Sequence, residues 1–348
     1  MKGDSQEARV ELPTPTWFAE LFPELLARRD LPGGRALDAV RDLVAGKVDD
    51  ARAAAFITAL RMKGESSEEI AAAAEVLREQ MVRLVPVNGP ALDTCGTGGD
   101  DSGTFNISTA AAIVAAGAGI PVVKHGNRAV SSRSGSADVL RELGVNVEGG
   151  SEWAQKCLER IGFAFCFAPH FHRGMAHVAA LRRKLGVRTI FNLLGPLANP
   201  ADAPYQLLGV GKPDLLDPLA GALAKLGTRQ SVLVCSHDGM DEVSLAAPTR
   251  VRLVRGNEYE SREWRPEEFG LGAVTADEIR ADGPAASAAI LRAVLAGENI
   301  PATRVTLANA AAALWAAEAV PSLKDGVARA EAAIASGAAR RVLDQLIA

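Results

Sequence analysis

The chain has 348 residues, more than a single hydrophobic core usually organises, so two domains are expected. Apolar residues make up 48% of the sequence, which excludes disorder over any long stretch. The 38 basic and 42 acidic residues are interspersed and give a net charge of −4, so no general attraction to nucleic acid or to an anionic membrane surface is expected.

Residues from about 17 to 85 carry a helical pattern. Leu37, Val40 and Val44 recur at helical spacing. Ser66 and Glu69 form a capping box, which predicts a helix over residues 68–84. Two prolines, an asparagine and a glycine within residues 86–90 then interrupt the pattern and predict a domain boundary.

After this boundary, short apolar runs alternate with helical stretches rich in alanine and leucine. This alternation is typical of an α/β fold with a mostly parallel sheet. Alanine-rich residues 309–319 and 328–339 predict packed helices at the end of the chain. The expected strands are Leu92–Cys95, Ile120–Val123, Val145–Val147, Phe163–Phe167, Gln206–Val210 and Ser231–Cys235.

The four cysteines lie in apolar contexts without C-x-x-C spacing, which favours buried free thiols over a metal site or a disulfide framework. The first residues contain no apolar segment of the signal-peptide kind. The longest apolar run, residues 110–123, is too short to cross a bilayer and is broken by glycine and proline. A soluble cytoplasmic protein with no membrane partner is therefore expected.

Residues 92–109 read LDTCGTGGDDSGTFNIST and place four glycines between a strand and a helix. Glycine is costly to order, so such a cluster indicates special backbone geometry or close approach of a ligand. Neither the Walker A pattern nor the G-x-G-x-x-G fingerprint is present. Asn106, Ser108 and Thr109 open the helix, whose unpaired N–H groups suit a phosphate or pyrophosphate. The alternatives are a flexible connection and a simple N-cap by Asn106 or Ser108.

A second unusual run, KHGNRAVSSRSGSADVL, occupies residues 124–140. Lys124 is expected to end a strand, where its amine can neutralise phosphate charge. The segment from Ser134 to Asp138 is expected to open another helix and a second anion site. Taken singly, Lys124 and Arg128 suit a solvated surface, and His125 suits a structural role in the core. The density of donors favours the anion site.

The third unusual run, HDGMDEVS at residues 237–244, follows a predicted strand. Asp241 and Glu242 can be an acidic turn, but beside a pyrophosphate they are suitable Mg²⁺ ligands, and Ser108 can add a hydroxyl oxygen. All three runs follow strand ends, where open α/β sheets bind ligands.

Together these residues resemble the anthranilate phosphoribosyltransferase family. The matching motifs are GTGGD, NIST, KHGNR, SGSADVL, LGVRTIFNLLGPLANP and the Asp-Glu pair, in the family's order. The resemblance implies a small N-terminal helical domain (residues 1–88) and a larger α/β domain (residues 89–348) of the nucleoside phosphorylase and phosphoribosyltransferase type. It also implies a hinge segment, residues 173–195, that returns to the helical domain, and a homodimer formed through the helical domains.

The reaction implied is transfer of the 5-phosphoribosyl group from phosphoribosyl pyrophosphate to the amine of anthranilate, releasing pyrophosphate, in tryptophan biosynthesis. The resemblance implies two Mg²⁺ ions, with metal ligands Ser108, Asp241 and Glu242, and anthranilate contacts Gly96, Asn127 and Arg182. No catalytic base is assigned, since an aromatic amine is neutral at pH 7; His125 and Asp100 are the candidate proton acceptors. The implied phosphoribosyl pyrophosphate contacts are Gly96, Gly99, Asp100, Thr104, Asn106, Ile107, Ser108, Thr109, Lys124, His125, Gly126, Asn127, Arg128, Ala129, Val130, Ser131, Ser132 and Ser136.

The sequence departs from the family in three places. Residues 172–175 read HRGM where the family usually has H-P-A-M, Asp101 replaces a small residue, and Ala198 replaces a threonine. Two alternatives stay open. A nucleoside phosphorylase of the same fold would not need the Asp-Glu pair, and a nucleic-acid-binding relative would need a basic surface stripe.

Overall fold

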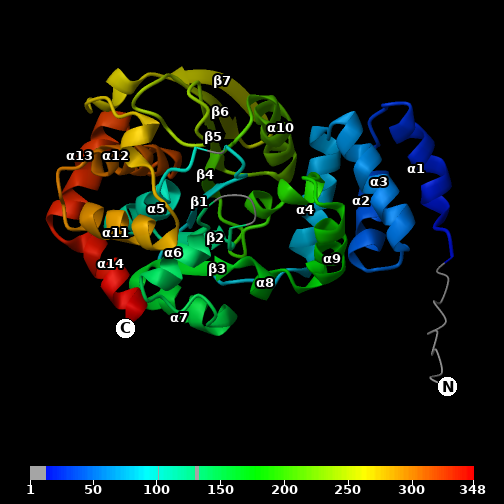
Figure 1. The fold of residues 1–348 in the computed structure, drawn as a ribbon, viewed down its shortest axis with the longest axis horizontal. Coiled ribbons are helices and arrows are strands. Elements are labelled where there is room, and N and C mark those ends of the chain that lie inside the picture. The colour runs from blue at the N-terminus through cyan, green and yellow to red at the C-terminus, as the bar shows by residue number, and fades with distance from the viewer. Residues whose placement is uncertain (1–12, 101, 130–132) are drawn as a thin grey trace.

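The computed structural model describes residues 13–100, 102–129 and 133–348 (Figure 1). Four helices come first, and strands alternating with helices follow. The helices are α1 Thr16–Leu26, α2 Gly33–Val44, α3 Asp50–Lys63, α4 Ser67–Gln80, α5 Ile107–Gly117, α6 Ser136–Glu142, α7 Gly150–Ile161, α8 Ala168–Phe171, α9 Ala176–Leu185, α10 Leu216–Leu226, α11 Pro284–Leu295, α12 Pro301–Ala316, α13 Leu323–Ala335 and α14 Ala338–Ile347. The strands are β1 Leu92–Gly96, β2 Val122–Gly126, β3 Phe163–Phe167, β4 Tyr205–Gly209, β5 Gln230–Ser236, β6 Thr249–Arg255 and β7 Glu258–Trp264.

Helices α1 to α4 form the N-terminal bundle, and the capping box predicted for α4 is confirmed. The Glu69 N–H donates to Ser66 Oγ (3.3 Å), and the Ser66 N–H donates to Glu69 Oε2 (2.8 Å). The predicted extension of this helix to residue 84 is wrong, because α4 ends at Gln80. Beyond it, the N–H of Leu84 donates to the carbonyl of Pro200 in the α/β domain, so tertiary hydrogen bonds replace helical ones.

The seven strands form one sheet in the order β3-β2-β1-β4-β5-β6-β7. The first five strands in this order are parallel, and β6 and β7 are antiparallel additions at one edge, so the predicted mostly parallel sheet is confirmed. The sequence analysis missed β6 and β7. Their signal is the Gly256-Asn257 turn between two extended runs, a pattern typical of a tight hairpin.

Two predicted strands need correction. Val145–Val147 is not a strand; the segment links α6 to α7, and both valines point into the core without pairing with a sheet strand. The apolar residues at positions 145 and 147 therefore reflect burial in the core, not membership of a strand. The strand predicted at Ile120–Val123 begins only at Val122, directly after Pro121, and continues to Gly126.

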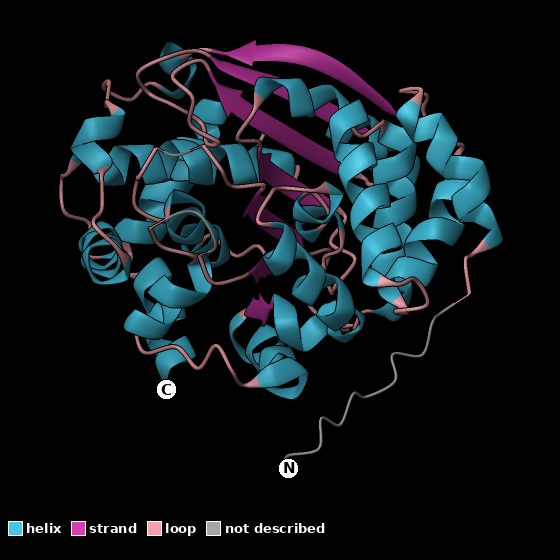
Figure 2. Ribbon diagram, turned by 45° about the vertical axis from the view of Figure 1, so that its right-hand side comes forward, coloured by secondary structure: helices cyan, strands magenta, loops and turns pink. Residues whose placement is uncertain are grey.

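Helices cover both faces of the sheet (Figure 2). Because strand side chains alternate, Leu207 of β4 points into a core shared with α5 and α12, while the neighbouring Leu208 points into a core shared with α10 and the bundle. The second core also includes Val178 and Leu181 of α9, which returns to pack beside the bundle (Figure 1). Bundle and sheet thus share one continuous apolar core.

Two further sequence-based expectations concern cysteines and membranes. Cys95, Cys157, Cys166 and Cys235 are all buried free thiols, as predicted. Within the described ranges, no helix combines the length and the apolar character needed to cross a bilayer.

Candidate active site

The three unusual runs meet at one edge of the sheet. Strands β1, β2 and β5 are parallel, so their carboxyl ends lie at the same edge. Lys124 of β2 donates from Nζ to Ser108 Oγ at the start of α5 (3.2 Å), and the Ser108 N–H donates to Glu242 Oε1 (3.1 Å). Side chains far apart in the chain therefore meet around the first turn of α5.

The glycine loop after β1 adopts a backbone that other residues avoid. Gly98 has φ +61° and Gly99 has φ +82°, both in the left-handed region. A Cβ on Gly98 would meet nothing within 4 Å, whereas a Cβ on Gly99 would lie 2.0 Å from Nη1 of Arg188. Arg188, in the segment between α9 and β4, donates from Nη2 to the carbonyl of Thr97 (2.9 Å). The loop is thus bent by its own glycines and held by the Arg188 side chain.

Asn106 precedes α5 but does not cap it, because no side-chain capping hydrogen bond is present. Its amide instead joins separate segments. Nδ2 donates to the carbonyl of Ser134 (3.3 Å), and Oδ1 accepts from the hydroxyls of Ser134 (3.0 Å) and Ser287 (2.9 Å). The simple N-cap interpretation of Asn106 is therefore wrong. Its amide fixes the start of α5 against Ser134, which precedes α6, and against Ser287 of α11.

Asp241 and Glu242 stand close together on the loop after β5. Burial, followed by repulsion from Asp100, raises the pKa of Asp241, and burial followed by repulsion from Asp241 raises the pKa of Glu242. A Cβ on Gly96 would come within 3.0 Å of Asp241 Oδ2, so this carboxylate faces the glycine loop. Unrelieved repulsion between neighbouring carboxylates is the electrostatic setting that a divalent cation stabilises.

Lys124 does not end its strand, because β2 continues to Gly126. Its side chain is buried and donates to the carbonyl of Thr94 as well as to Ser108. Burial lowers the pKa of this ammonium, while neighbouring carboxylates including Glu242 oppose the shift. In this arrangement the ammonium of Lys124 lies next to the Ser108 hydroxyl and close to the carboxylates of Asp241 and Glu242.

The loop after β2 is built on close backbone approaches. A Cβ on Gly126 would lie 2.1 Å from Ser136 Oγ. The Asp138 carboxylate accepts from the N–H of Ala129 (2.9 Å), as well as from Gly135 at the start of α6. The exposed Asn127 accepts the Arg128 N–H on its own Oδ1 (2.8 Å). The predicted contacts Val130, Ser131 and Ser132, like Asp101, lie outside the described residues.

Two histidines that pack against each other lie beside this loop. The His125 ring meets the His172 ring edge to face, with centroids 4.8 Å apart, and His125 Nδ1 donates to the carbonyl of Gly195 (2.9 Å). Burial lowers the pKa of His125 to about 3 and that of His172 to about 4, so both rings are neutral at pH 7. The sequence analysis did not single out His172; its only signal was membership of the divergent HRGM run.

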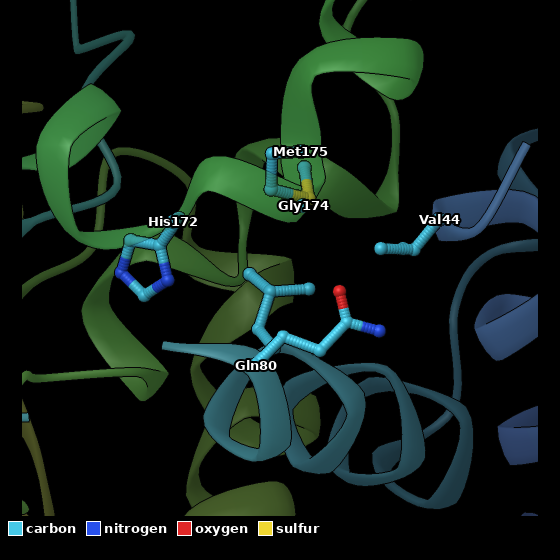
Figure 3. Close-up of a pocket in the computed structure, with 6 residues that line it drawn as sticks. Val44, Gln80, His172, Gly174 and Met175 are labelled. Carbon is cyan, nitrogen blue, oxygen red and sulfur yellow. The ribbon is translucent and has the colours of Figure 1, made fainter. Parts of the chain in front are cut away.

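The HRGM departure is accommodated locally. His172 lines a cavity of about 10 Å³ with Gly174, Met175, Val44, Leu77 and Gln80 (Figure 3). A Cβ on Gly174, which the family's usual alanine would carry, would lie 2.2 Å from Gln80 Oε1. The Gln80 side chain of α4 thus occupies the place of the missing methyl group, and residues 173–175 form a single 3₁₀ turn.

Arg182 lies near the end of α9 and is half-buried. Burial, with repulsion from Arg188, lowers the pKa of its guanidinium. Its side chain forms no ion pair or hydrogen bond with any other described residue. Neither Arg182 nor Arg188 forms an ion pair with a described carboxylate, and two such neighbouring guanidinium groups suit an anionic ligand.

The donor set suits Mg²⁺ rather than a metal held entirely by protein side chains. Across the described ranges, no group of three or more His, Cys, Asp or Glu side chains is arranged to hold a metal ion. Two carboxylates and one hydroxyl fit Mg²⁺, which usually keeps water and substrate phosphate oxygens as its other ligands.

Comparison with known proteins gives a consistent result. The profile of the helical bundle domain of a glycosyl transferase family matches residues 19–81, and that of the family's α/β domain matches residues 88–340. The chain is 46% identical to the anthranilate phosphoribosyltransferase of Desulfitobacterium hafniense, covering 92% of this chain and 96% of the relative. It is 49% identical to that of Anaeromyxobacter dehalogenans, covering 93% and 96%.

Solved structures agree. The anthranilate phosphoribosyltransferase of Thermus thermophilus superimposes with a TM-score of 0.86 at 42% identity, covering 94% of this chain and 98% of the other. The Saccharomyces cerevisiae enzyme in complex with PRPP (phosphoribosyl pyrophosphate) and Mg superimposes with a TM-score of 0.87 at 31% identity, covering 96% and 98%. The same yeast enzyme in complex with 4-fluoroanthranilate gives a TM-score of 0.84 at 31% identity, covering 95% and 96%.

Proposed function

This chain belongs to the anthranilate phosphoribosyltransferase family, and from that premise we propose which residues bind each substrate and the metal. Its activity is the transfer of the phosphoribosyl group from phosphoribosyl pyrophosphate to anthranilate in tryptophan biosynthesis. The assignment of residues rests on one observation above all: Ser108, Lys124 and Glu242 meet at the carboxyl ends of three parallel strands.

Phosphoribosyl pyrophosphate binds over the glycine loop and the first turn of α5. The left-handed glycines turn the backbone of residues 98–99, and the N-terminus of α5 directs N–H groups and a positive dipole end toward the same edge of the sheet. The short approaches at Gly126 and Gly135 hold the loop after β2 against the start of α6. These contacts bind the leaving pyrophosphate without any covalent chemistry.

Ser108, Asp241 and Glu242 hold Mg²⁺ on the pyrophosphate, and the resemblance implies two ions. When bound, Mg²⁺ offsets the negative charge that grows on pyrophosphate as the C1–O bond breaks. Lys124 beside Glu242 limits the repulsion within the acidic pair, and Gly96 leaves room for Asp241 next to the glycine loop. This arrangement is fixed before the substrate arrives, so little reorganisation is needed during the reaction.

Anthranilate binds through its carboxylate to Arg182, with Asn127 and Gly96 beside the ring. The amine is already neutral, so its lone pair attacks C1 as the C1–O bond breaks, and its proton leaves afterwards. Burial lowers the pKa of His125 to about 3, which makes its ring a weak proton acceptor at neutral pH. Movement of residues 173–195 brings Arg182 and the amine toward C1.

The helical domain also supplies the surface for a homodimer. Phe18, Phe22 and Leu26 recur every fourth residue along α1, the two phenylalanine rings stack 4.8 Å apart, and Leu26 is 65% exposed. An apolar stripe on the outer helix of the bundle fits a second copy of the same stripe. We also retain domain limits of 1–88 and 89–348, the hinge segment and a cytoplasmic location as predictions.

The dimer is tested by light scattering on Leu26→Glu, which is expected to be a monomer. Val85→Glu is the matched control, because Val85 is equally apolar and 68% exposed but lies between α4 and β1. A dimeric Leu26→Glu protein, or a monomeric Val85→Glu protein, would refute the proposed surface.

The substrate assignment is tested by following anthranilate fluorescence with phosphoribosyl pyrophosphate and Mg²⁺. Fluorescence is expected to disappear with the wild-type protein and to persist when Asp241 and Glu242 are both alanine. If activity persists after the Mg²⁺ in the assay has been chelated, the metal assignment is wrong, but the assigned reaction still stands.

A further inference from the structure

Asn309 is a fully buried polar residue on α12, outside the substrate-binding loops. Its Oδ1 accepts the N–H of Val243 (2.9 Å), and its Nδ2 donates to the carbonyl of the same residue (3.0 Å). Nδ2 also donates to the carbonyl of Val305, one turn earlier on α12 (3.0 Å). One side chain thus satisfies both backbone groups of Val243 and is itself held by its own helix.

Val243 directly follows the proposed metal ligands Asp241 and Glu242, so the position of its backbone determines the path of the chain just after them. On the other side, a Cβ on Gly209 would lie 1.9 Å from the carbonyl oxygen of Asp241, which leaves no space for the acidic pair to move toward β4. Two contacts therefore fix the acidic pair: Gly209 packs against the carbonyl of Asp241, and the Asn309 amide hydrogen-bonds to the backbone of Val243, the residue that follows Glu242. No other side chain of the described residues hydrogen-bonds to the backbone of Val243.

We propose that Asn309 is a positioning residue that holds Asp241 and Glu242 in the geometry required for Mg²⁺ bound to phosphoribosyl pyrophosphate. This inference rests on the proposed metal role of the acidic pair. Asparagine suits the task because its amide carries a donor and an acceptor side by side, matching the two backbone groups of one residue. Without the amide, the N–H and carbonyl of Val243 are left unpaired in a dry core, and the loop shifts to regain partners.

The experiment compares Asn309→Ala with Thr306→Val. Thr306 is also fully buried on α12, one turn before Asn309, but its hydroxyl donates only to the carbonyl of Ala302 within the helix (2.8 Å). Binding of phosphoribosyl pyrophosphate is measured by calorimetry across a Mg²⁺ series without anthranilate, so no turnover contributes. Circular dichroism and a thermal melt establish that each variant is folded.

Asn309→Ala is expected to need about 10–100-fold more Mg²⁺ for half-maximal binding, with kcat restored near wild type at saturating Mg²⁺, because partners that orient metal ligands carry effects of this size. Thr306→Val is expected to keep the wild-type Mg²⁺ curve. Asn309→Asp retains the shape and the acceptor for the Val243 N–H, so it should give an intermediate shift, and it serves as the test if the alanine variant does not fold.

A folded Asn309 variant whose Mg²⁺ curve superimposes on that of the wild type would overturn the proposal, as would an equal shift in Thr306→Val. The wild-type series distinguishes this failure from that of the metal assignment. If wild-type binding is independent of Mg²⁺, the role of Asp241 and Glu242 is wrong and the proposal falls with it; a normal wild-type curve with an unshifted variant refutes only the role of Asn309.

Discussion

Replacing Gly99 with alanine separates two reasons for a glycine in the loop after β1. Gly99 has φ +82°, and an added Cβ would lie 2.0 Å from Arg188 Nη1. Gly98, with φ +61°, has the same backbone requirement but open space around it. Gly98→Ala therefore reports backbone strain alone, and Gly99→Ala reports strain together with displacement of Arg188.

The expected magnitudes follow from these contacts. A left-handed conformation costs an alanine about 1–2 kcal/mol, of which about 0.4–1 kcal/mol is offset by reduced entropy of the unfolded chain. Gly99→Ala also loses the hydrogen bond from the Arg188 guanidinium to Thr97, which contributes roughly 1.5–3 kcal/mol to holding the loop. The added loss corresponds to about 10–150-fold weaker binding of phosphoribosyl pyrophosphate, because 1.36 kcal/mol equals one factor of ten.

Calorimetric titration of phosphoribosyl pyrophosphate with Mg²⁺ measures the affinity, and a thermal melt measures global stability. The loop can relax locally when no ligand is bound, so the melting temperature of both variants should change little while the affinity of Gly99→Ala falls sharply. In Gly99→Ala/Arg188→Ala the two losses should not add, because the first change already displaces the guanidinium.

Unchanged affinity in Gly99→Ala would show that the glycines serve only flexibility and would remove the main support for the proposed binding loop. Fully additive losses in the double variant would instead show that Arg188 and Gly99 act separately.

Three further predictions use other parts of the site. Replacing both Asp241 and Glu242 with alanine should abolish turnover while the circular dichroism spectrum is kept; near wild-type turnover at limiting Mg²⁺ would contradict the metal assignment. Arg182→Ala should raise the KM for anthranilate about tenfold to a hundredfold and that for phosphoribosyl pyrophosphate little, with the exposed Arg183→Ala as control; equal changes in both KM values would indicate a folding defect instead. His172 is neutral in the folded protein with a pKa of about 4, so below pH 6.5 only the unfolded chain gains its proton and stability falls. Relative to His172→Gln, denaturant melts of the wild type should lose about 2 kcal/mol between pH 6.5 and pH 4.5 and almost nothing between pH 7.5 and pH 8.5; parallel pH profiles would show that the ring is solvated.

The overall class of the fold was predictable because its signals are local. Helical spacing and one capping box located the bundle, and alternating apolar runs located five of the seven strands. The failures came where tertiary contacts decide. Leu84 bonds to the carbonyl of Pro200 instead of extending α4, and the buried valines 145 and 147 have no neighbouring strand. The hairpin of β6 and β7 had a local signal at Gly256 that was not used.

The site was predictable to the level of its loops, since glycine, hydroxyl and acidic residues cluster at strand ends. The individual side-chain contacts within the site were not predictable. The sequence placed Lys124 at a strand end, but the extra length of β2 buries its ammonium behind Ser108. Arg188 and His172 stood within quoted motifs, yet their contacts with Thr97 and His125 join residues that are far apart in the chain and depend on how the segment after β3 folds back.

The apolar core that joins the bundle to one face of the sheet limits how this enzyme can be divided or recombined. Leu208 and Leu233 of the sheet, Leu219 of α10 and Ile70 of α4 belong to the same cluster. A cut between residues 81 and 88 would follow the chain but split this cluster, leaving each fragment with an apolar face exposed to water. Exchange of the bundle between relatives therefore requires matching changes on α10 and on the facing side of the strands, because the two parts share one core.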